Sequence, residues 1–375
     1  MIPFERHHNF IIVKVLFQGF IPLRFIVDTG AEHTILIKKE IAQILQISYE
    51  RELKIMGTDL ITEIKAYIAR RIRLELTNLT LEKDILVLDD DYFKFDKFVG
   101  LDVQGIIGAE VFKGHILKVD YSRQLLTIYT PSVFDERETR KFEKIPIEII
   151  KSKPYAHFDA KISSDSTIQL KLLLDTGASL ALLLHTYSTP GLTLPLNTIK
   201  GNIASGLGGQ IDGYLGRVRA FKMGKSNVVG IISHFQELQK TTDSVYLSGR
   251  NGLVGGDLLS RFNFIIDFID EKLYLQPNRY FKETFEYDKS GLMLIAGGQN
   301  LNRFFVNSIL PKSPAEEAGI LPNDEIIRVN FLSSKFHSLA SINRIFQKKE
   351  GKIMRLVIKR GSRKQVIYLK LRNLI

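Results

Sequence analysis

Residues 25–31 read Phe-Ile-Val-Asp-Thr-Gly-Ala, and residues 172–178 repeat this pattern as Leu-Leu-Leu-Asp-Thr-Gly-Ala. The two aspartates, Asp28 and Asp175, lie 147 positions apart. Two further motif pairs keep that offset: Ile-Ile-Gly at 106–108 with Leu-Val-Gly at 253–255, and Val-Asp-Tyr at 119–121 with Ile-Asp-Phe at 266–268. Three matches at one offset indicate that the chain contains two copies of one structural unit.

Each copy is predicted to consist mainly of short β-strands. Apolar and β-branched residues dominate 11–17 and 23–27, and the runs at 116–120 and 125–129 alternate around a two-residue turn. Helices are expected only at 38–45, 109–112 and 257–261. We therefore expect a mainly β protein with two β-barrel lobes, 1–132 and 133–281, related by a pseudo-two-fold axis. Such an axis would bring equivalent residues of the two copies face to face.

The repeated turn can deliver two carboxylates to one place. An apolar strand that runs into Asp-Thr-Gly ends with its aspartate at a tight turn, so Asp28 and Asp175 are the candidate catalytic pair. Two carboxylates at short range cannot both ionise cheaply, and such a pair holds one proton. The ionised member can then deprotonate a water while the protonated member binds the substrate carbonyl.

The residues after each aspartate are expected to support the turns. Gly30 and Gly177 would supply backbone freedom and room for close approach. Thr29 and Thr176 would tie the two turns together through hydroxyl hydrogen bonds to the opposite loop.

These motifs resemble those of the aspartic peptidases, specifically the retropepsin-like lobes of bacterial proteins that also carry a PDZ domain. The resemblance covers nearly the whole chain and implies an aspartic endopeptidase, active as a monomer because both aspartates lie in one chain. The first copy departs from the family pattern at Glu32-His33, where the second has Ser179-Leu180. Glu32 is therefore expected to make the two aspartates titrate differently. The alternative is a catalytically silent module that holds peptides in the same cleft.

The resemblance also implies a flap in each lobe. The candidate flap residues are Gly57 and Thr58 in the first copy and Gly206 and Gly208 in the second. Their glycines suit hairpins that fold over a substrate and exclude water. A phosphate-binding loop is the competing interpretation of 206–209, but 210–223 alternates like a strand and does not open a helix.

A third unit, 282–375, resembles a PDZ domain. Its Ser-Pro-Ala at 313–315, Ala-Gly at 318–319 and Asp-Glu-Ile at 324–326 stand where that family has them, although Asn323 replaces the usual glycine. The resemblance implies that a carboxyl-terminal peptide adds a strand to the sheet edge, with its carboxylate on the loop Gly291, Leu292 and Met293 and its side chain on a helix at 339–346. The alternative is a spacer whose groove is closed by the lobes or by the chain's own tail.

Composition excludes several other classes. The chain has no cysteine, which removes disulfides and thiol chemistry, and its eight histidines show no metal-ligand spacing, so no metal or cofactor is expected. His33 and His185 are interpreted as satisfied surface or pocket residues. No apolar run reaches the about 18 to 20 residues of a membrane span. A native start at Met1 would imply the cytoplasm, and a removed leader would imply the periplasm or secretion.

The net charge of +11 is concentrated at the end of the chain, since 283–375 holds 16 Lys and Arg against 8 Asp and Glu. The basic stretch 359–364 could bind phosphate or acidic lipid, or could form a solvent-exposed turn between two strands. No nucleic-acid partner is expected.

Overall fold

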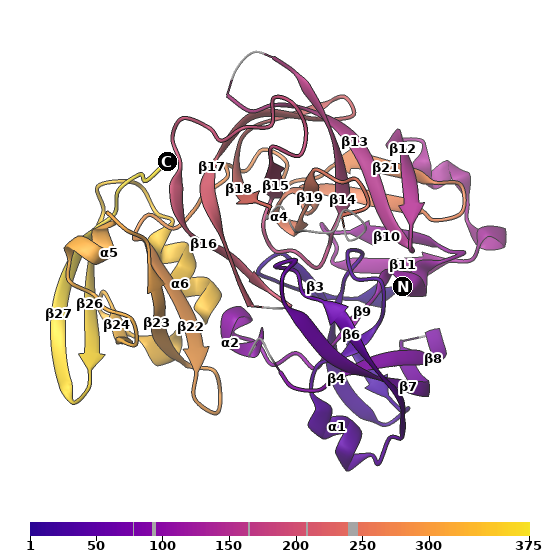
Figure 1. The fold of residues 1–375 in the computed structure, drawn as a ribbon, viewed down its shortest axis with the longest axis horizontal. Helices are drawn as coiled ribbons and strands as arrows, with labels where there is room; N and C mark the ends of the chain where they lie inside the picture. Colours follow the sequence, from indigo (N-terminus) through magenta and orange to yellow (C-terminus); the bar gives the residue numbers. More distant parts are fainter. Residues whose placement is uncertain (78, 92–94, 164–165, 208, 239–246) are drawn as a thin grey trace.

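The computed structural model describes residues 1–375 except 78, 92–94, 164–165, 208 and 239–246. Its architecture confirms the expected fold class: two β-rich lobes stand beside a smaller α+β unit (Figure 1). The predicted short helices are also present, as α1 (Lys39–Ile44), the 3-10 helix η1 (Ala109–Phe112) and α4 (Gly256–Leu259).

The first lobe contains an eight-stranded sheet in the order β2-β3-β4-β9-β5-β8-β7-β6. Its strands are β2 (Glu5–His7), β3 (Phe10–Phe17), β4 (Ile21–Val27), β5 (Ile35–Leu36), β6 (Tyr49–Met56), β7 (Glu63–Leu76), β8 (Leu79–Leu88) and β9 (Gly105–Ile107). A further pairing between β3 and β7 brings the sheet back on itself. The short helix α2 (Phe95–Val99) lies between β8 and β9.

The second lobe repeats this order strand for strand, as β12-β13-β14-β19-β15-β18-β17-β16 with an additional β13–β17 pairing. Its strands are β12 (Glu143–Ile150), β13 (Lys153–Lys161), β14 (Ile168–Leu174), β15 (Leu182–Thr186), β16 (Ile199–Gly206), β17 (Gly209–Met223), β18 (Ser226–Glu237) and β19 (Gly252–Val254). The sequence duplication is therefore a duplication of topology.

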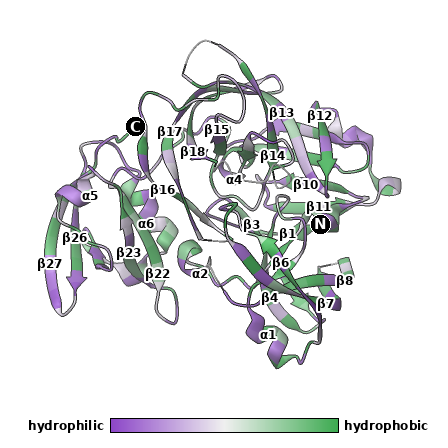
Figure 2. Ribbon diagram, viewed as in Figure 1, coloured by the Kyte–Doolittle hydropathy of each residue, from purple (hydrophilic) through white to green (hydrophobic). Residues whose placement is uncertain are grey.

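A sheet across the pseudo-two-fold joins the lobes. Its strand order is β1-β11-β10-β20-β21-β12, built from β1 (Ile2–Pro3), β10 (Ile116–Asp120), β11 (Leu125–Tyr129), β20 (Phe262–Asp267) and β21 (Lys272–Pro277). The equivalent strands β10 and β20 pair antiparallel at the centre, with Val119 opposite Phe264. Hydrophobic residues predominate in β10 and β11 (Figure 2).

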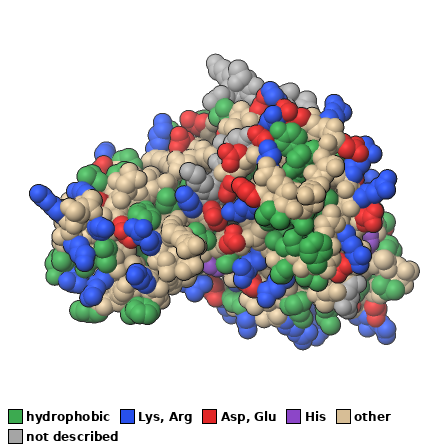
Figure 3. Space-filling model, turned by 90° about the horizontal axis from the view of Figure 1, so that it is seen from below, with side chains coloured by type: hydrophobic (Ala, Val, Ile, Leu, Met, Phe, Trp, Pro, Cys, Tyr) green, Lys and Arg blue, Asp and Glu red, His purple; other side chains and the backbone are tan. Residues whose placement is uncertain are grey.

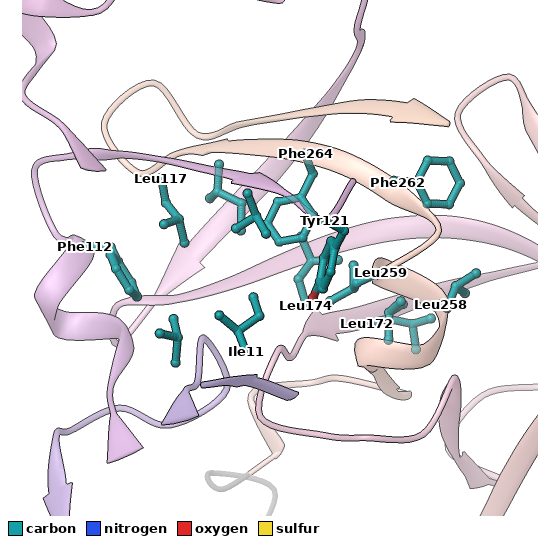
Figure 4. Close-up of a cluster of buried hydrophobic side chains, with 14 of the residues drawn as sticks. Ile11, Phe112, Leu117, Tyr121, Leu172, Leu174, Leu258, Leu259, Phe262 and Phe264 are labelled. Atoms are coloured by element: carbon teal, nitrogen blue, oxygen red, sulfur yellow. The ribbon is translucent and has the colours of Figure 1, made fainter. Parts of the chain in front are cut away.

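The core beneath this sheet draws on both lobes. Leu117 and Tyr121 of the first copy pack with Phe262 and Phe264 of the second (Figure 4). All four side chains are at most 1% exposed, and the leucine and the two phenylalanines each contribute about 1.5–3 kcal/mol of hydrophobic free energy. The lobes therefore share one core.

The central strands that lead to the aspartates are buried on both faces. β4 pairs in parallel with β9, and β14 pairs in parallel with β19, which explains why both strands end in uninterrupted apolar runs. A Cβ at Gly105 would overlap the Phe25 ring and lie 2.7 Å from the Ile35 carbonyl oxygen. Only glycine fits where β9 crosses these residues.

The third unit has its own core and a sheet in the order β22-β23-β24-β26-β27. Its elements are β22 (Leu292–Gly297), β23 (Arg303–Ile309), α5 (Pro314–Glu317), β24 (Glu325–Val329), α6 (Leu339–Phe346), β26 (Ile353–Arg360) and β27 (Arg363–Lys370). The segment before it belongs elsewhere, because Phe285 and Tyr287 pack in the core of the two lobes.

Lys and Arg side chains are scattered over the third unit, at the left of Figure 3. Part of this charge is neutralised locally. Arg360 binds Asp324 at 2.7 Å, and Arg372 binds Glu317 at 2.8 Å.

Candidate active site

Each aspartate follows its strand and is supported by the later apolar-apolar-Gly motif of the same lobe. The Asp28 N–H donates to the Ile107 carbonyl oxygen at 3.0 Å, and the Asp175 N–H donates to the Val254 carbonyl oxygen at 2.9 Å. Ile107 and Val254 are the last residues of β9 and β19. The repeated motifs thus hold the two turns in equivalent ways.

The two threonines bind the lobes to each other directly behind the aspartates. Thr29 Oγ1 donates to the Leu174 carbonyl oxygen at 2.6 Å and accepts the Thr176 N–H at 3.1 Å. Thr176 Oγ1 donates to the Val27 carbonyl oxygen at 2.7 Å and accepts the Thr29 N–H at 3.1 Å. Both threonines are at most 1% exposed, so this reciprocal set is shielded from water.

The glycines let each carboxylate approach the opposite turn. A Cβ at Gly30 would lie 2.5–2.7 Å from the carboxyl atoms of Asp175, and a Cβ at Gly177 would overlap the carboxylate of Asp28. Any other residue at these positions would push the two aspartates apart. The structure therefore brings Asp28 and Asp175 together at the junction of the lobes.

The environment of the pair favours one shared proton. Burial raises the pKa of both Asp28 and Asp175, and the neighbouring charge of Asp175 raises the pKa of Asp28 further. Hydrogen bonds to Asp28 Oδ1 from the N–H groups of Gly30, at 2.7 Å, and Ala31, at 3.0 Å, oppose this rise. Two carboxylates in this setting do not both ionise near neutral pH.

The two aspartates differ, but the main cause is not the expected Glu32. Burial raises the pKa of Asp175, while the hydrogen bond from Asp28 and the charge of Arg250 lower it. The pKa of Asp28 is thus raised further than that of Asp175. Glu32 instead lies 3.7 Å from the His33 ring nitrogen.

Sequence reasoning missed Arg250, although the repeat contained the signal. Position 250 is 147 residues after Val103, so an arginine stands where the first copy has a buried valine. The next residue in each copy has a side-chain amide that makes the same hydrogen bond. Gln104 Oε1 accepts the Arg24 N–H at 2.8 Å, and Asn251 Oδ1 accepts the Lys171 N–H at 2.9 Å. A repeat alignment that scored charge differences would have marked Arg250.

The candidate flap residues of the two lobes meet each other. Gly57 and Thr58 lie at the tip of the β6–β7 hairpin, and Gly206 ends β16; Gly208 lies outside the described residues. Thr58 donates to the Leu207 carbonyl oxygen through its N–H, and through Oγ1 at 2.9 Å. Leu207 packs against an apolar cluster of the first lobe. The tips of the two hairpins therefore contact each other.

Side chains at the first tip stiffen its turn. Asp59 Oδ1 accepts the N–H groups of Ile61, at 3.2 Å, and Thr62, at 3.1 Å, and its Oδ2 accepts the Thr62 hydroxyl at 2.6 Å. Gln236 Nε2 of the second lobe donates to the Asp59 carbonyl oxygen at 3.4 Å.

The expected carboxylate loop of the third unit is partly engaged already. Gly291 has φ +80° and donates its N–H to Asp288 Oδ1 at 2.8 Å, and the Leu292 N–H donates to Ser290 Oγ at 3.1 Å. Met293 lies in β22 opposite Ser308. Two of the three N–H groups thus have acceptors within the domain.

Other titratable groups give no sign of a metal site. Across the described ranges, no group of three or more potential ligands could hold a metal ion. His185 is buried, and neither ring nitrogen has a hydrogen-bond partner among the described residues. Burial lowers the pKa of His185 to about 3. None of the described helices is long and apolar enough to cross a membrane.

Comparison with known proteins agrees with these features. Residues 13–111 match the model of a family described as aspartyl protease, and residues 305–360 match that of the PDZ domain. The chain combines an aspartyl-protease-like region with a PDZ domain. No curated protein matches this chain.

Among solved structures, the chain is similar to the crystal structure of an aspartic proteinase from Irpex lacteus. The identity is 14% and the TM-score 0.46, over 76% of this chain and 98% of that one.

Proposed function

We propose that this protein is an aspartic endopeptidase that hydrolyses peptide bonds through a water activated between Asp28 and Asp175. The observation that carries the proposal is the reciprocal threonine set, because it holds two carboxylates together at a buried junction where their mutual repulsion is costly. Such an arrangement is expected where the pair is used.

The reaction follows from the two protonation states. The Asp175 carboxylate takes a proton from the bound water, and the water oxygen attacks the substrate carbonyl carbon. At the same time Asp28 gives its proton to the carbonyl oxygen. The tetrahedral diol then collapses: the C–N bond breaks, the amide nitrogen leaves with a proton from the pair, and a hydroxyl proton returns to it. Water is consumed, and no covalent enzyme intermediate forms.

The substrate is proposed to be an extended peptide that lies beneath the joined flaps. Gly57, Thr58, Gly206 and Gly208 would cover it and exclude bulk water. The active site would be complete in a monomer, with 1–132 and 133–281 as its two lobes. The rival proposal, a silent module that only holds peptides, would use the same space without turnover.

The PDZ domain, whose core runs from Leu292 to Leu371, is proposed to bind peptide between β22 and α6 and so to recruit substrate or regulate the lobes. The expected carboxyl-terminal ligand on Gly291, Leu292 and Met293 would have to replace the acceptors that two of these N–H groups already have.

Digestion of a peptide library tests the peptidase proposal. The protein should cleave peptides between acidic and near-neutral pH, and a transition-state-mimicking inhibitor of aspartic peptidases should stop it. Asp28→Asn and Asp175→Asn should each lower kcat by at least about 10³-fold, because either change leaves one carboxylate to act as both acid and base. Asp90→Asn, at an exposed aspartate, is the matched control.

Mixing the two inactive variants distinguishes a single-chain site from one shared between chains. A single-chain site predicts no recovery on mixing and a specific activity independent of protein concentration. Turnover retained by either single variant would refute the intramolecular pair. Binding of library peptides by the wild-type protein without any cleavage would favour the silent module.

A further inference from the structure

The PDZ groove is bounded by β22 and α6. β22 is an edge strand: among the described residues it pairs only with β23, which leaves its other side open for a ligand. Ala296 lies near the end of β22, and Leu339 is the first residue of α6. These two residues mark the end of the groove farthest from the Gly291 loop.

A segment of the first lobe lies at that end of the groove. Helix α2 packs against β22 and faces it in Figure 1. Gly100, which follows α2 with φ +69°, approaches so closely that a Cβ there would lie 2.8 Å from Leu339 Cβ and 3.8 Å from Ala296 Cβ. Segment 96–100 therefore contacts both the strand and the helix that bound this end of the groove.

The first lobe holds this segment in place. The Val99 carbonyl oxygen lies 2.9 Å from His7 Nε2, and Asp96 accepts from Lys38 Nζ at 3.3 Å. Val99 is buried in a first-lobe cluster with Phe10 and Ile12. The segment is thus shared between a lobe and the PDZ domain.

The opposite end of the groove is unsuited to a free carboxyl terminus. The half-buried carboxylate of Asp288 already accepts the N–H groups of Ser290, at 2.7 Å, and Gly291, at 2.8 Å. An incoming carboxylate would meet this like charge in place of free donors. Beside the loop, a Cβ at Gly201 of β16 would lie 2.6 Å from Leu310 Cδ2, so the second lobe reaches the domain here.

We propose that the PDZ groove is a receptor for an internal chain segment and not for a carboxyl terminus, and that its resident ligand is segment 96–100 of the first lobe. The inference rests on the peptide-binding role proposed for this groove, but it does not depend on peptidase activity.

Occupancy of the groove is connected to the candidate active site. Segment 96–100 continues through Gln104, whose N–H donates to the Arg24 carbonyl oxygen at 2.9 Å and whose carbonyl oxygen accepts the Ile37 N–H at 2.8 Å. It then enters β9, whose last residue supports the Asp28 N–H. A peptide that displaced 96–100 would act on the strand that positions Asp28.

Competition between the resident segment and a free copy of it tests the proposal. The probe is a labelled decapeptide of residues 95–104, acetylated and amidated, and the protein is the full chain carrying Asp28→Asn so that no probe is hydrolysed. Gly100→Asn adds a side chain that must clash with Leu339, while asparagine tolerates the positive φ. Gly114→Asn is the matched control, because Gly114 has φ +76° and no atom within 4 Å of its Cβ position.

A tethered segment competes at an effective concentration on the order of millimolar. Undocking it should therefore tighten probe binding at least about 10-fold in the Gly100→Asn protein, and leave the Gly114→Asn protein like the parent. Equal affinities in the two variants, or no binding by a folded Gly100→Asn protein, would overturn the proposal.

The ligand class is tested with residues 95–99 as a pentapeptide ending in either a free carboxylate or an amide. The proposal expects equal binding of the two by the Gly100→Asn protein. At least about tenfold preference for the free carboxylate would identify a carboxyl-terminal receptor and refute it. Because these readouts are binding constants of an inactive protein, failure of the peptidase proposal leaves them unchanged.

A disulfide trap gives a result even if Gly100→Asn unfolds. The chain has no cysteine, so Gly100→Cys with Ala296→Cys introduces its only two thiols. Leu339→Gly is added because it removes the side chain that a Cβ at position 100 would meet. The Cβ separation of the two cysteines, 3.8 Å, is that of an ordinary disulfide. Mild oxidation should consume both thiols within one chain and reduce probe binding relative to the reduced protein. Thiols that stay free, or unchanged probe binding after oxidation, would show that the segment does not occupy the groove.

Discussion

Replacing Thr29 by valine should remove the hydrogen bonds of its hydroxyl group between the lobes, and so lower the free energy of unfolding, while keeping the shape of the side chain. The hydroxyl donates to the Leu174 carbonyl oxygen at 2.6 Å and accepts the Thr176 N–H at 3.1 Å. Valine leaves both backbone groups without these partners at a site that is 0% exposed. An unpaired buried group costs about 1–3 kcal/mol, so the free energy of unfolding should fall by about 2–6 kcal/mol. That is a large share of the roughly 5–15 kcal/mol available to a folded domain.

Urea denaturation followed by far-UV circular dichroism measures this loss, since the chain has no tryptophan to report by fluorescence. Thr29→Ser is the control: it keeps the hydroxyl and should cost about 1 kcal/mol for the lost methyl group. Thr176→Val should match Thr29→Val, because its hydrogen bonds are equivalent. A loss below about 1 kcal/mol for Thr29→Val, or an equal loss for Thr29→Ser, would refute the reasoning.

Two further predictions concern pH. Because burial lowers the pKa of His185 to about 3 in the folded state, only the unfolded chain gains its proton as pH falls below about 6.5, and stability is lost from there towards pH 3. The free energy of unfolding should therefore fall by about 2 kcal/mol less in His185→Leu than in the wild type when the pH is lowered from 7.5 to 5. Unfolding curves of both proteins at the two pH values test this, and an equal fall in the two proteins contradicts it. Burial and Asp175 raise the pKa of Asp28, so the folded state holds a proton that the unfolded chain releases above about pH 4. Asp28→Asn should therefore stabilise the protein at pH 8 and not at pH 3, as thermal melts would show; an equal effect at both pH values would exclude the ionisation of the pair as the cause.

Much of the architecture was predictable because its signals are local. An apolar strand that ends in Asp-Thr-Gly specifies a central strand and a tight turn whatever surrounds it, and the constant 147-residue offset implied two equivalent lobes. The roles of Thr29 and Thr176 stay predictions, but the hydrogen bonds that those roles require are present. Separate motifs within 313–326 were enough to recognise the PDZ domain.

Tertiary structure alone decided which neighbours these elements acquire. Periodicity indicates that a position is buried, but it does not identify the residue that covers it. The sequence therefore pointed to Glu32 as the group that makes the aspartates unequal and did not reveal Arg250. The contact between Gly100 and Leu339 joins residues 239 positions apart, and no local pattern encodes it. By itself, the sequence determined two lobes, their paired aspartates and a peptide-binding domain. The packing of lobe against domain determined what lies in the groove, because that packing depends on shape and charge contributed by strands far apart in the chain.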